Sequence, residues 1–331
     1  MKGVLILMRA VLCTEFGPPE KLEIKDIPVP KPSKGQVRIK VEACGVNFPD
    51  TLIIENKYQY KPDLPFSPGG EVAGIIDELG EGVEGFSIGD SVMAMTLFGG
   101  FAEYVVIEAK ALLRRPPEMD GVTAAGFTMT YGTSMYALKQ RGQLKEGEKL
   151  LVLGAGGGVG ITAVEIGKLM GAEVIAAASN EEKLEAAKKA GADHLINYGK
   201  RDLRDQVKAI VGNSGIDVLY DPVGGDLFEP CVRSMAWGGR ALVIGFASGN
   251  IPKLPTNLTL LKGCSVVGVF WGNFRLKETS SDNENFQILF NWYKKKELSP
   301  LVSQQFPLEN ATEALLTLAN RKAVGKVILK P

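Results

Sequence analysis

The N-terminal third of the chain alternates apolar and polar residues. Residues 36–41 read Gln-Val-Arg-Ile-Lys-Val, a period of two that is typical of a strand with one buried face. Proline and glycine interrupt such segments often, as at residues 28–35 and 62–70. This pattern predicts antiparallel β structure with long loops from about residue 9 to residue 125.

A different pattern begins near residue 128, where short apolar segments alternate with amphipathic ones. The apolar segments have the length of buried strands and the amphipathic ones that of helices. Six strands joined by helices predict a parallel sheet covered on both faces, which is a doubly wound dinucleotide-binding fold. The first predicted helix follows the first strand and ends near residue 170, and the other helices span 181–190, 202–211 and 227–235. The predicted strands are residues 149–153, 173–178, 194–197, 217–220, 240–244 and 265–269.

The pattern changes again over the last 60 or so residues. Helices are expected near residues 285–296 and 311–320, followed by a strand at 326–329. We interpret this segment as the chain returning to the first domain. The predicted domains are therefore residues 1–128, an inserted domain at 129–268, and a return at 269–331.

Composition places the chain among ordinary globular proteins of about two domains. It has 331 residues, 45% hydrophobic and 23% charged. The 38 Lys and Arg balance 38 Asp and Glu, so the basic surplus of a nucleic-acid binder is missing. No apolar run approaches the ~20 residues of a membrane span. We expect neither nucleic acid nor a membrane as a partner.

Cysteine and histidine usage narrows the chemistry. The single histidine, His194, excludes sites that need two or three imidazoles, such as the common catalytic zinc centres. The opening segment is apolar but too short for a signal peptide, and translation can start at Met1 or at Met8. A reduced, cytoplasmic setting is expected because the four cysteines are far apart and form no CxxC pair; they are Cys13, Cys44, Cys231 and Cys264.

A glycine cluster follows the first strand of the predicted parallel sheet. Residues 150–160 read LLVLGAGGGVG, a strand that runs through glycines into a helix. Glycine lets the backbone turn tightly and approach a pyrophosphate, whose charge the helix N-terminus attracts. The pattern is Ala155-x-Gly157-x-x-Gly160, with Ala in the first position. We interpret it as a dinucleotide-binding loop rather than a purely structural turn.

The end of the second strand indicates which dinucleotide binds. NAD sites usually place an acid there, about 20 residues on, for the ribose 2′-hydroxyl. This chain has Ser179, then Asn180, with Lys183 one turn into the helix, which favours a 2′-phosphate and hence NADP. Alternatively, Ser179 and Glu182 form a capping box and Lys183 is a solvated helix residue. In a further alternative, Glu181 and Glu182 are the acids that bind the ribose. Acids in the first turn of a helix also simply complement the helix dipole.

Several segments together resemble the quinone oxidoreductases, the zinc-free, zeta-crystallin-like branch of the medium-chain dehydrogenase/reductase superfamily. The resemblance covers about residues 9–330 and implies a split GroES-like β catalytic domain with an inserted Rossmann domain, an α/β fold. It also implies a cofactor between the domains and homodimers or tetramers that pair through the nucleotide-binding sheet. The segments are GEKLLVLGAGGGVGITAVEIGK from Gly147, CGVNFPD at 44–50, PFSPGGEVAGII at 65–76, DPVGGD at 221–226, GRALVIGFASG at 239–249 and NLTLLKGCSVVGVFWG at 257–272.

Departures from the alcohol dehydrogenase branch bear on the reaction. Where that branch has its first zinc-binding Cys, this chain has Asn47, and where it reads Gly-His-Glu, this chain has Gly69, Gly70 and Glu71. We therefore expect no metal at the site. Without a Lewis acid to ionise an alcohol, the expected reaction is hydride transfer to an electron-poor quinone or α,β-unsaturated carbonyl.

The resemblance also implies roles for individual residues. Asn47 is expected to donate a hydrogen bond to the acceptor oxygen or the nicotinamide ribose, and Tyr58 to bind the ring or supply a proton; alternatively, Tyr58 is a substrate-loop aromatic without a chemical role. Asp50 is expected to anchor a turn and His194 to be structural. The expected NADPH-binding residues are Thr133, Gly157, Gly158, Val159, Gly160, Ser179, Lys183, Tyr198, Ile244, Phe246, Ser248, Val269, Phe270 and Trp271.

Three functions are compatible with these features. The first is an NADPH-dependent reductase of quinones or α,β-unsaturated carbonyls that works as a homodimer. The second is a reductase of enoyl-CoA thioesters, which would need extra cationic surface for the CoA phosphate. The third is an NADPH-binding protein without turnover, such as a lens-type structural protein or an RNA-binding moonlighter, although the neutral charge weakens the RNA version.

Overall fold

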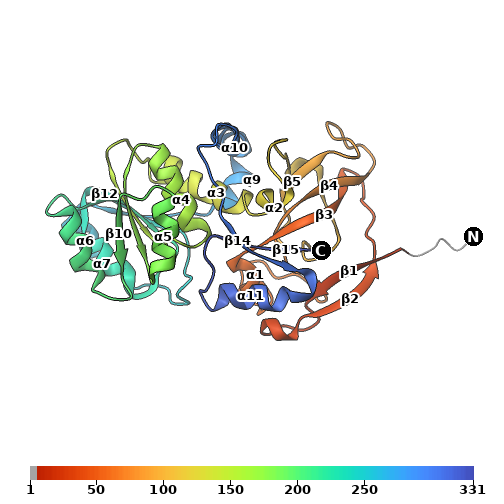
Figure 1. The fold of residues 1–331 in the computed structure, drawn as a ribbon, viewed down its shortest axis with the longest axis horizontal. Helices are drawn as coiled ribbons and strands as arrows, with labels where there is room; N and C mark the ends of the chain where they lie inside the picture. The colour runs from red at the N-terminus through yellow and green to blue at the C-terminus, as the bar shows by residue number, and fades with distance from the viewer. Residues whose placement is uncertain (1–5) are drawn as a thin grey trace, which may run out of the picture. The chain divides into compact units, whose positions relative to one another are not determined.

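The computed structural model describes residues 6–331, drawn in Figure 1. The contacts divide the chain into two compact units. Unit 1 contains residues up to Met129 together with Pro300–Pro331, and unit 2 contains Thr130–Ser299. The segment 1–7 that precedes Met8 lies mostly outside the described residues.

Unit 1 is built on a mainly antiparallel sheet of seven strands. Its order is β14-β15-β3-β4-β5-β7, with β6 also paired to β3. A separate two-stranded antiparallel sheet joins β1 and β2. The strands are β1 (Leu7–Leu12), β2 (Glu23–Pro28), β3 (Gln36–Val46), β4 (Glu71–Leu79), β5 (Ser91–Met95), β6 (Tyr104–Glu108), β7 (Leu112–Arg114), β14 (Val302–Pro307) and β15 (Lys326–Lys330).

The alternating pattern of β3 positions the site of unit 1. Val37, Ile39 and Val41 are buried while the residues between them are not, as the period of two predicts. The strand continues beyond the predicted segment to Val46, where both faces are buried. Its end leads directly into α1 (Phe48–Ile53). The remaining helices of unit 1 are α2 (Gly121–Ala124) and α11 (Ala311–Ala319).

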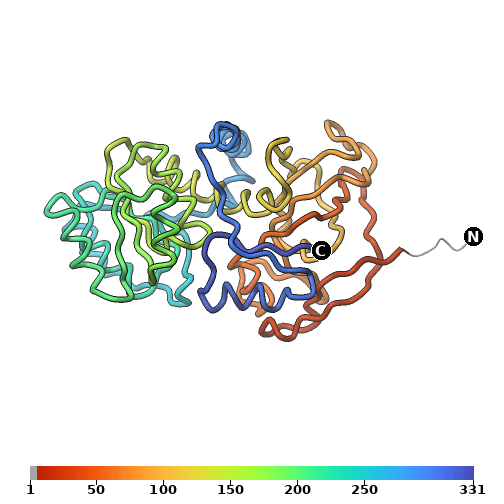
Figure 2. Tube along the Cα trace, viewed as in Figure 1, coloured from red at the N-terminus to blue at the C-terminus, as the bar shows by residue number. Residues whose placement is uncertain are grey.

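The C-terminal segment completes the sheet of unit 1. Strand β15 pairs antiparallel with β3, and β14 pairs parallel with β15. In Figure 2 the blue C-terminal tube runs beside the red and orange strands of the N-terminal part. Residues about 280 positions apart in sequence are therefore neighbours, as Lys326 and Val46 are.

Unit 2 contains a six-stranded parallel sheet of order β10-β9-β8-β11-β12-β13. The order reverses between β8 and β11, as in a doubly wound fold, so the predicted fold class is confirmed. The strands are β8 (Lys149–Leu153), β9 (Glu173–Ala178), β10 (His194–Asn197), β11 (Ile216–Asp221), β12 (Met235–Val243) and β13 (Ser265–Gly268). The helices are α3 (Thr128–Met135), α4 (Gly158–Leu169), α5 (Glu181–Lys189), α6 (Leu203–Val211), α7 (Phe228–Arg233), α8 (Asn257–Lys262), α9 (Trp271–Lys277) and α10 (Thr279–Lys294).

Some elements differ from the sequence prediction. Helices α8 and α9 were not predicted, and α10 begins at Thr279 rather than near residue 285. Both α9 and α10 belong to unit 2, so the chain returns to unit 1 at Pro300 and not at residue 269. The reason is packing within unit 2: Trp271 of α9 donates its indole N–H to Asp282 of α10, with 2.8 Å between Nε1 and Oδ1.

No helix among residues 6–331 is long and apolar enough to cross a membrane.

Candidate functional site

The glycine cluster of unit 2 forms a tight turn between β8 and α4. Gly154 has φ +59°, and Gly157 precedes the first residue of α4 in extended conformation. A Cβ on Gly160 would lie 2.1 Å from the carbonyl oxygen of Gly154, so only glycine fits there. A Cβ on Gly156 would lie 2.5 Å from Cβ of Lys183. The loop therefore holds the N-terminus of a 12-residue helix open to an anion and brings Lys183 beside it.

No acidic residue lies at the end of β9. The helix that follows, α5, does not begin with the capping box of Ser179 and Glu182. Asn180 is the N-cap of α5, and its side chain accepts from the Lys183 N–H at 3.0 Å. The capping box with Ser179 is therefore wrong, because α5 begins one residue later than that pattern needs. Ser179 is exposed at the strand end.

Tyr198 and Glu181 belong to the same edge of the sheet. The Tyr198 N–H donates to Ala178 at 3.1 Å, which places Tyr198 next to the end of β9. Oε1 of Glu181 accepts from Asn197 and from Lys200, each at 2.7 Å. The Glu181 carboxylate is thus already bonded at the end of β10, which weakens the idea that it binds a ribose.

The loops after β11 and β12 pack against each other. Asp221 is 2% exposed, and its Oδ1 accepts from the N–H groups of Val223 and Gly224, both at 2.8 Å. Burial raises the pKa of this carboxyl. The Ser248 N–H donates to Val223 at 2.9 Å. The predicted residues after β12 (Ile244, Phe246 and Ser248) are consequently held beside the DPVGGD segment.

The three residues after β13 differ in their surroundings. Val269 donates its N–H to Val243, whereas the Phe270 side chain is 54% exposed. Trp271 is 5% exposed, and its indole ring lies on Gly132 of α3, where a Cβ would be 2.5 Å from the ring. The Trp271 ring therefore packs α9 against α3. If Trp271 contacts the cofactor as expected, it does so through its backbone.

Thr133 lies in α3, which is fixed to α4 by a buried polar network. The neighbouring Ser134 hydroxyl contacts those of Thr162 at 2.8 Å and Tyr220 at 2.9 Å, and donates to the Val159 carbonyl at 3.0 Å. Thr133 itself is half-buried. The network holds Thr133 in a helix that is bonded to the first turn of α4, just after the glycine loop.

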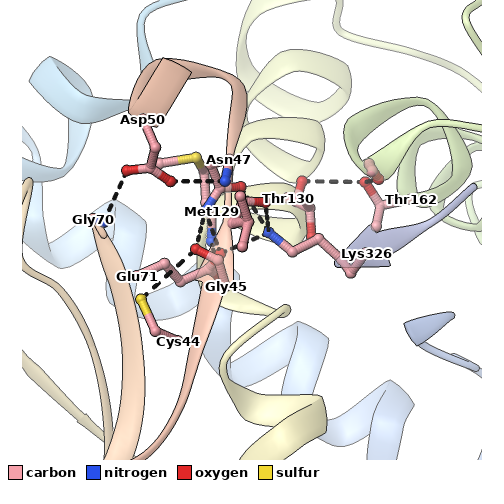
Figure 3. Close-up of polar contacts among 12 residues, drawn as sticks. Cys44, Gly45, Asn47, Asp50, Gly70, Glu71, Met129, Thr130, Thr162 and Lys326 are labelled. Atoms are coloured by element: carbon pink, nitrogen blue, oxygen red, sulfur yellow. Dashed lines mark hydrogen bonds and ion pairs between the residues drawn. The ribbon is translucent and has the colours of Figure 1, made fainter. Parts of the chain in front are cut away.

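In unit 1, Asn47 lies at the junction of β3 and α1, within a cluster drawn in Figure 3. Its Nδ2 donates to the Gly45 carbonyl at 3.2 Å and to Oε2 of Glu71 at 2.9 Å. Its Oδ1 accepts from the Lys326 ammonium at 2.6 Å. Lys326 also bonds Oε2 of Glu71 at 3.0 Å, and Asn47, Glu71 and Lys326 are all less than 9% exposed. Both amide hydrogens of Asn47 are thus donated inside unit 1, and the donor role expected for it requires breaking one of these bonds.

Asp50 is the third residue of α1, and its side chain bonds the N-cap Asn47 and fixes the neighbouring glycine loop. Its carboxylate accepts from the Asn47 N–H at 2.7 Å and from the Gly70 N–H at 3.2 Å. Burial raises the pKa of Asp50 to about 7, although these hydrogen bonds and the Lys326 ammonium lower it. This geometry agrees with the turn-anchoring role expected for Asp50.

Tyr58 lies in the loop after α1, half-buried against the core of unit 1. Burial raises the pKa of its hydroxyl above 10, and the charge of Asp50 adds to the shift. Tyr58 therefore remains protonated at neutral pH and can act as a hydrogen-bond donor.

Two residues of this cluster were missed from the sequence. Glu71 is fully buried, and its Oε1 also accepts from the Met129 N–H at 2.8 Å, at the last residue of unit 1. Lys326 opens β15 and is buried, whereas Lys330 at the other end of the strand is exposed. The signal in the sequence was a charged residue in each of two strand segments, Glu71 and Lys326. Such residues are almost never fully buried unless they are paired.

His194, expected to be structural, pairs with Glu173 at 2.9 Å on neighbouring strands. Both side chains are more than a third exposed, and the pair lies at the N-terminal end of β10, away from the carboxyl ends where the cofactor candidates gather.

Most of the predicted cofactor residues therefore gather at one edge of the unit 2 sheet, beyond the carboxyl ends of its parallel strands. This is where doubly wound sheets bind their ligands. Unit 1 contributes a separate buried polar cluster of Asn47, Asp50, Glu71 and Lys326.

Comparison with known proteins agrees with this description. Residues 33–117 match the alcohol dehydrogenase GroES-like domain, and residues 158–287 match the zinc-binding dehydrogenase family. Rat quinone oxidoreductase-like protein 2 is 38% identical over 97% of this chain and 91% of its own length. Human quinone oxidoreductase is 35% identical over 98% of both chains.

Solved structures extend the similarity to the whole fold. Escherichia coli quinone oxidoreductase complexed with NADPH has a TM-score of 0.91 and 28% identity, covering 98% of this chain and 100% of that one. A mycobacterial protein complexed with NADPH has a TM-score of 0.92 and 30% identity, with the same coverage. The fold is that of a medium-chain dehydrogenase/reductase. The chain belongs to the quinone oxidoreductase family of that superfamily.

Zinc, which the matched dehydrogenase family implies, does not fit the residues of unit 1. Asn47 and Gly70 stand where the resemblance implies zinc ligands in the alcohol dehydrogenases, and neither residue is a usual zinc ligand. The Glu71 carboxylate is paired with the Lys326 ammonium, which would repel a second cation. Burial raises the pKa of the nearby Cys44 thiol and so disfavours the thiolate. Residues 6–331 contain no group of three or more His, Cys, Asp or Glu side chains that could hold a metal ion.

Proposed function

We propose that this protein is an NADPH-dependent oxidoreductase that transfers hydride to a quinone or an α,β-unsaturated carbonyl without zinc. The observation that carries the proposal is the edge of unit 2, where a glycine loop with no room for a Cβ lies beside Lys183 and the neighbouring strand ends without an acid. The NADPH complexes of similar quinone oxidoreductases support the choice of cofactor.

The residues of unit 2 have distinct roles in this proposal. The N–H groups at the start of α4 bind the pyrophosphate, with Gly157, Gly158, Val159 and Gly160 forming the loop. Thr133, Ile244, Phe246, Ser248, Val269, Phe270 and the Trp271 backbone surround the rest of the cofactor. Ser179, Lys183 and Tyr198 bind the 2′-phosphate, because a hydroxyl and an ammonium form charge-assisted hydrogen bonds with it.

Unit 1 provides the acceptor side of the reaction. The reduced nicotinamide supplies the hydride, so the protein residues mainly bind and orient. Tyr58 is the better donor to the acceptor oxygen, since its hydroxyl stays protonated at neutral pH whereas both amide hydrogens of Asn47 are already donated. The residues of unit 1 do not fit a zinc ion that would lower the pKa of a bound alcohol, and we therefore infer that the acceptor is itself electron-poor.

Two copies of the chain form a homodimer in this proposal. Strand β13 is the outermost strand of the unit 2 sheet, and its side chains are largely exposed. The edge face, which we define as Trp237, Leu260, Leu261 and Val266, carries side chains that are 42–84% exposed. A second copy that adds its own β13 would extend the sheet and cover this apolar face.

A cytoplasmic location is part of the proposal. Cys13, Cys44 and Cys231 are buried, and Cys264 is half-buried. None of them is in a disulfide, which fits a reducing compartment.

A panel of acceptors tests the function. NADPH oxidation is measured with 1,4-benzoquinone, an alkenal and crotonyl-CoA at equal concentrations. The proposal predicts turnover with the first or second compound and little with the CoA thioester. A preference for crotonyl-CoA would favour an enoyl-CoA reductase, and no turnover with any of the three would favour a nucleotide-binding protein without catalysis.

A further inference from the structure

The chain passes between the two units at two crossings. The first crossing lies between Met129 and Thr130, and the second lies between Ser299 and Pro300. Packed cores do not deform continuously, so a change in the relative position of the units has to turn on backbone dihedrals at or near these crossings. The bonds that hold the chain beside each crossing therefore decide how freely the units move.

On the side of unit 1, each crossing is bonded within one or two residues. The Met129 N–H donates to Oε1 of the fully buried Glu71 at 2.8 Å (Figure 3). The Leu301 carbonyl accepts from the Lys326 N–H at 2.8 Å. Little chain beyond the crossings themselves is thus left to turn on this side.

On the side of unit 2, one carboxylate of α4 bonds residues at both crossings. The Tyr131 hydroxyl donates to Oε2 of Glu165 at 2.5 Å, and the Ser299 N–H donates to Oε1 of the same side chain at 2.9 Å. One turn earlier in α4, the Thr162 hydroxyl donates to the Thr130 carbonyl at 3.2 Å (Figure 3). Two chain segments that are far apart in sequence are therefore joined through the Glu165 side chain.

Burial keeps water from replacing these bonds. Glu165 is 7% exposed and Tyr131 1%. Burial raises the pKa of the Tyr131 hydroxyl, which therefore keeps its proton and donates it. A buried carboxylate that loses a donor bears a desolvation penalty and becomes free to turn. Loss of the bond at one crossing consequently weakens the bond at the other.

We propose that Glu165 is a positioning residue that connects the two crossings, so that unit 1 and unit 2 move about a single hinge fixed to α4. Its effect on catalysis rests on the proposed function, in which unit 2 holds the cofactor and unit 1 the acceptor side. Hydride transfer needs the reacting atoms within about 3.5 Å of each other, and a looser hinge makes that approach rarer. NADPH binding, whose proposed contacts all lie in unit 2, does not depend on the hinge.

A substitution at the first crossing, measured at the second, tests the connection. Tyr131→Phe removes the hydroxyl and leaves the atoms that join Glu165 to Ser299 in place. Hydrogen exchange of the Ser299 N–H, followed by mass spectrometry on peptides that differ by this residue, should become about fivefold faster. Glu165→Ala should accelerate it at least as much.

The matched control is Ser134→Ala, which removes another fully buried hydroxyl of α3. Ser134 bonds α4 at Val159 and Thr162 but does not bond Glu165. Its loss should leave the exchange of the Ser299 N–H within about twofold of the wild-type rate. Equal acceleration in Ser134→Ala and Tyr131→Phe would mean a general loosening of α3 and would overturn the proposal.

Steady-state kinetics with 1,4-benzoquinone and NADPH titration test the positioning role. Glu165→Ala is expected to lower kcat by about tenfold and to leave the dissociation constant of NADPH within about twofold. Glu165→Gln should lose no more than about threefold in kcat. Its oxygen still accepts from Ser299 and its NH₂ can donate to the Tyr131 oxygen, although the hydroxyl hydrogen then loses Glu165 as its acceptor.

Unchanged exchange at Ser299 in Tyr131→Phe would show that the two bonds are independent, and the proposal would be wrong. An unchanged kcat in a folded Glu165→Ala protein, or an equal loss of NADPH affinity, would contradict the positioning role. Tyr131→Phe, which removes a single oxygen atom, keeps the test decisive if Glu165→Ala does not fold. If the wild type reduces no acceptor, the proposed function fails instead, while the exchange data still decide whether the crossings are connected.

Discussion

At the scale of single residues, the proposed function makes Lys183 the side chain that discriminates between the two coenzymes. It lies against Gly156 of the glycine loop, one turn into a helix whose N-cap is Asn180. Lys183→Glu is expected to weaken NADPH binding by about tenfold or more while NADH binding changes little, because an acid repels a 2′-phosphate and accepts from a 2′-hydroxyl. Fluorescence titration with both coenzymes measures the ratio.

The matched control is Lys188→Glu, the same charge change at an exposed position near the end of α5. Its ratio of NADPH to NADH affinity should equal that of the wild type. An unchanged ratio in Lys183→Glu would remove Lys183 from the phosphate site.

Asp50 makes the stability of unit 1 depend on pH. Its pKa rises from 3.8 to about 7 on burial, so between these values the folded protein keeps a proton that the unfolded chain has lost. The free energy of unfolding contributed by Asp50 therefore decreases as pH rises and levels off above about pH 7. Relative to Asp50→Asn, the wild type should lose about 3 kcal/mol between pH 4.5 and pH 7.5.

Urea unfolding of both proteins across this pH range measures the effect. The difference between them isolates Asp50 from the other titrating groups, because Asn does not titrate. A difference that stays constant with pH would mean that Asp50 is ionised throughout.

Residue types could be predicted from the sequence more readily than their partners. Asn47 was identified by its position in CGVNFPD, yet the donor role assigned to it depends on neighbours that no local pattern reveals. Lys326 lies 255 positions from Glu71 in the chain, and the two meet because β3 pairs with both β15 and β4. The capping residue of α5 was likewise misassigned by one position, since Ser179 and Asn180 are both good N-caps.

At the scale of elements, the turn between β8 and α4 offers a matched pair of glycine substitutions. Gly160→Ala places a Cβ 2.1 Å from a backbone oxygen, so the protein should be destabilised by about 2 kcal/mol or more. In Gly157→Ala the nearest atom lies 3.4 Å away and φ is −86°, so folding should be retained. Gly157→Ala is nevertheless expected to weaken NADPH binding by about tenfold, because the Cβ meets the bound pyrophosphate.

Thermal melting and NADPH titration separate the two effects. Full NADPH affinity in a folded Gly157→Ala protein would mean that the pyrophosphate does not approach this loop.

Most strands of unit 2 could be predicted with close boundaries because each apolar strand is bounded by polar or glycine residues, although β12 begins at Met235 and not at residue 240. The predicted strand 173–178 coincides with β9, and the strand 194–197 with β10. Helices α8 and α9 were missed, since they are short and carry several exposed apolar residues, such as Leu260 and Leu276. Surfaces of this kind have no helical hydrophobic period to detect.

At the scale of the whole molecule, the edge face of unit 2 predicts how the chain assembles. Trp237→Asp combined with Val266→Lys should convert a dimer to monomers, because charges on an outer strand block strand pairing and the apolar cover is lost. Sedimentation velocity measures the change. Ile88→Asp in unit 1, which also places a charge on a mostly exposed apolar residue, should leave the assembly unchanged.

A dimer that survives the double substitution would place the interface elsewhere, and a monomeric wild type would contradict the proposed assembly altogether.

The change of hydrophobic period near residue 128 predicted two units, but it did not predict where the chain returns to unit 1. The pattern of polar and apolar residues in α9 and α10 is typical of surface helices. Their membership of unit 2 depends on side-chain contacts such as that of Trp271 with Gly132. Local pattern predicts which elements exist, and long-range packing decides to which unit they belong.

The most direct measurement is NADPH consumption at 340 nm with 1,4-benzoquinone, using protein stripped of metal by a chelator. We predict full turnover with NADPH and at least about tenfold lower kcat/KM with NADH. Equal rates with both coenzymes, or activity that returns only when zinc is added, would contradict the account.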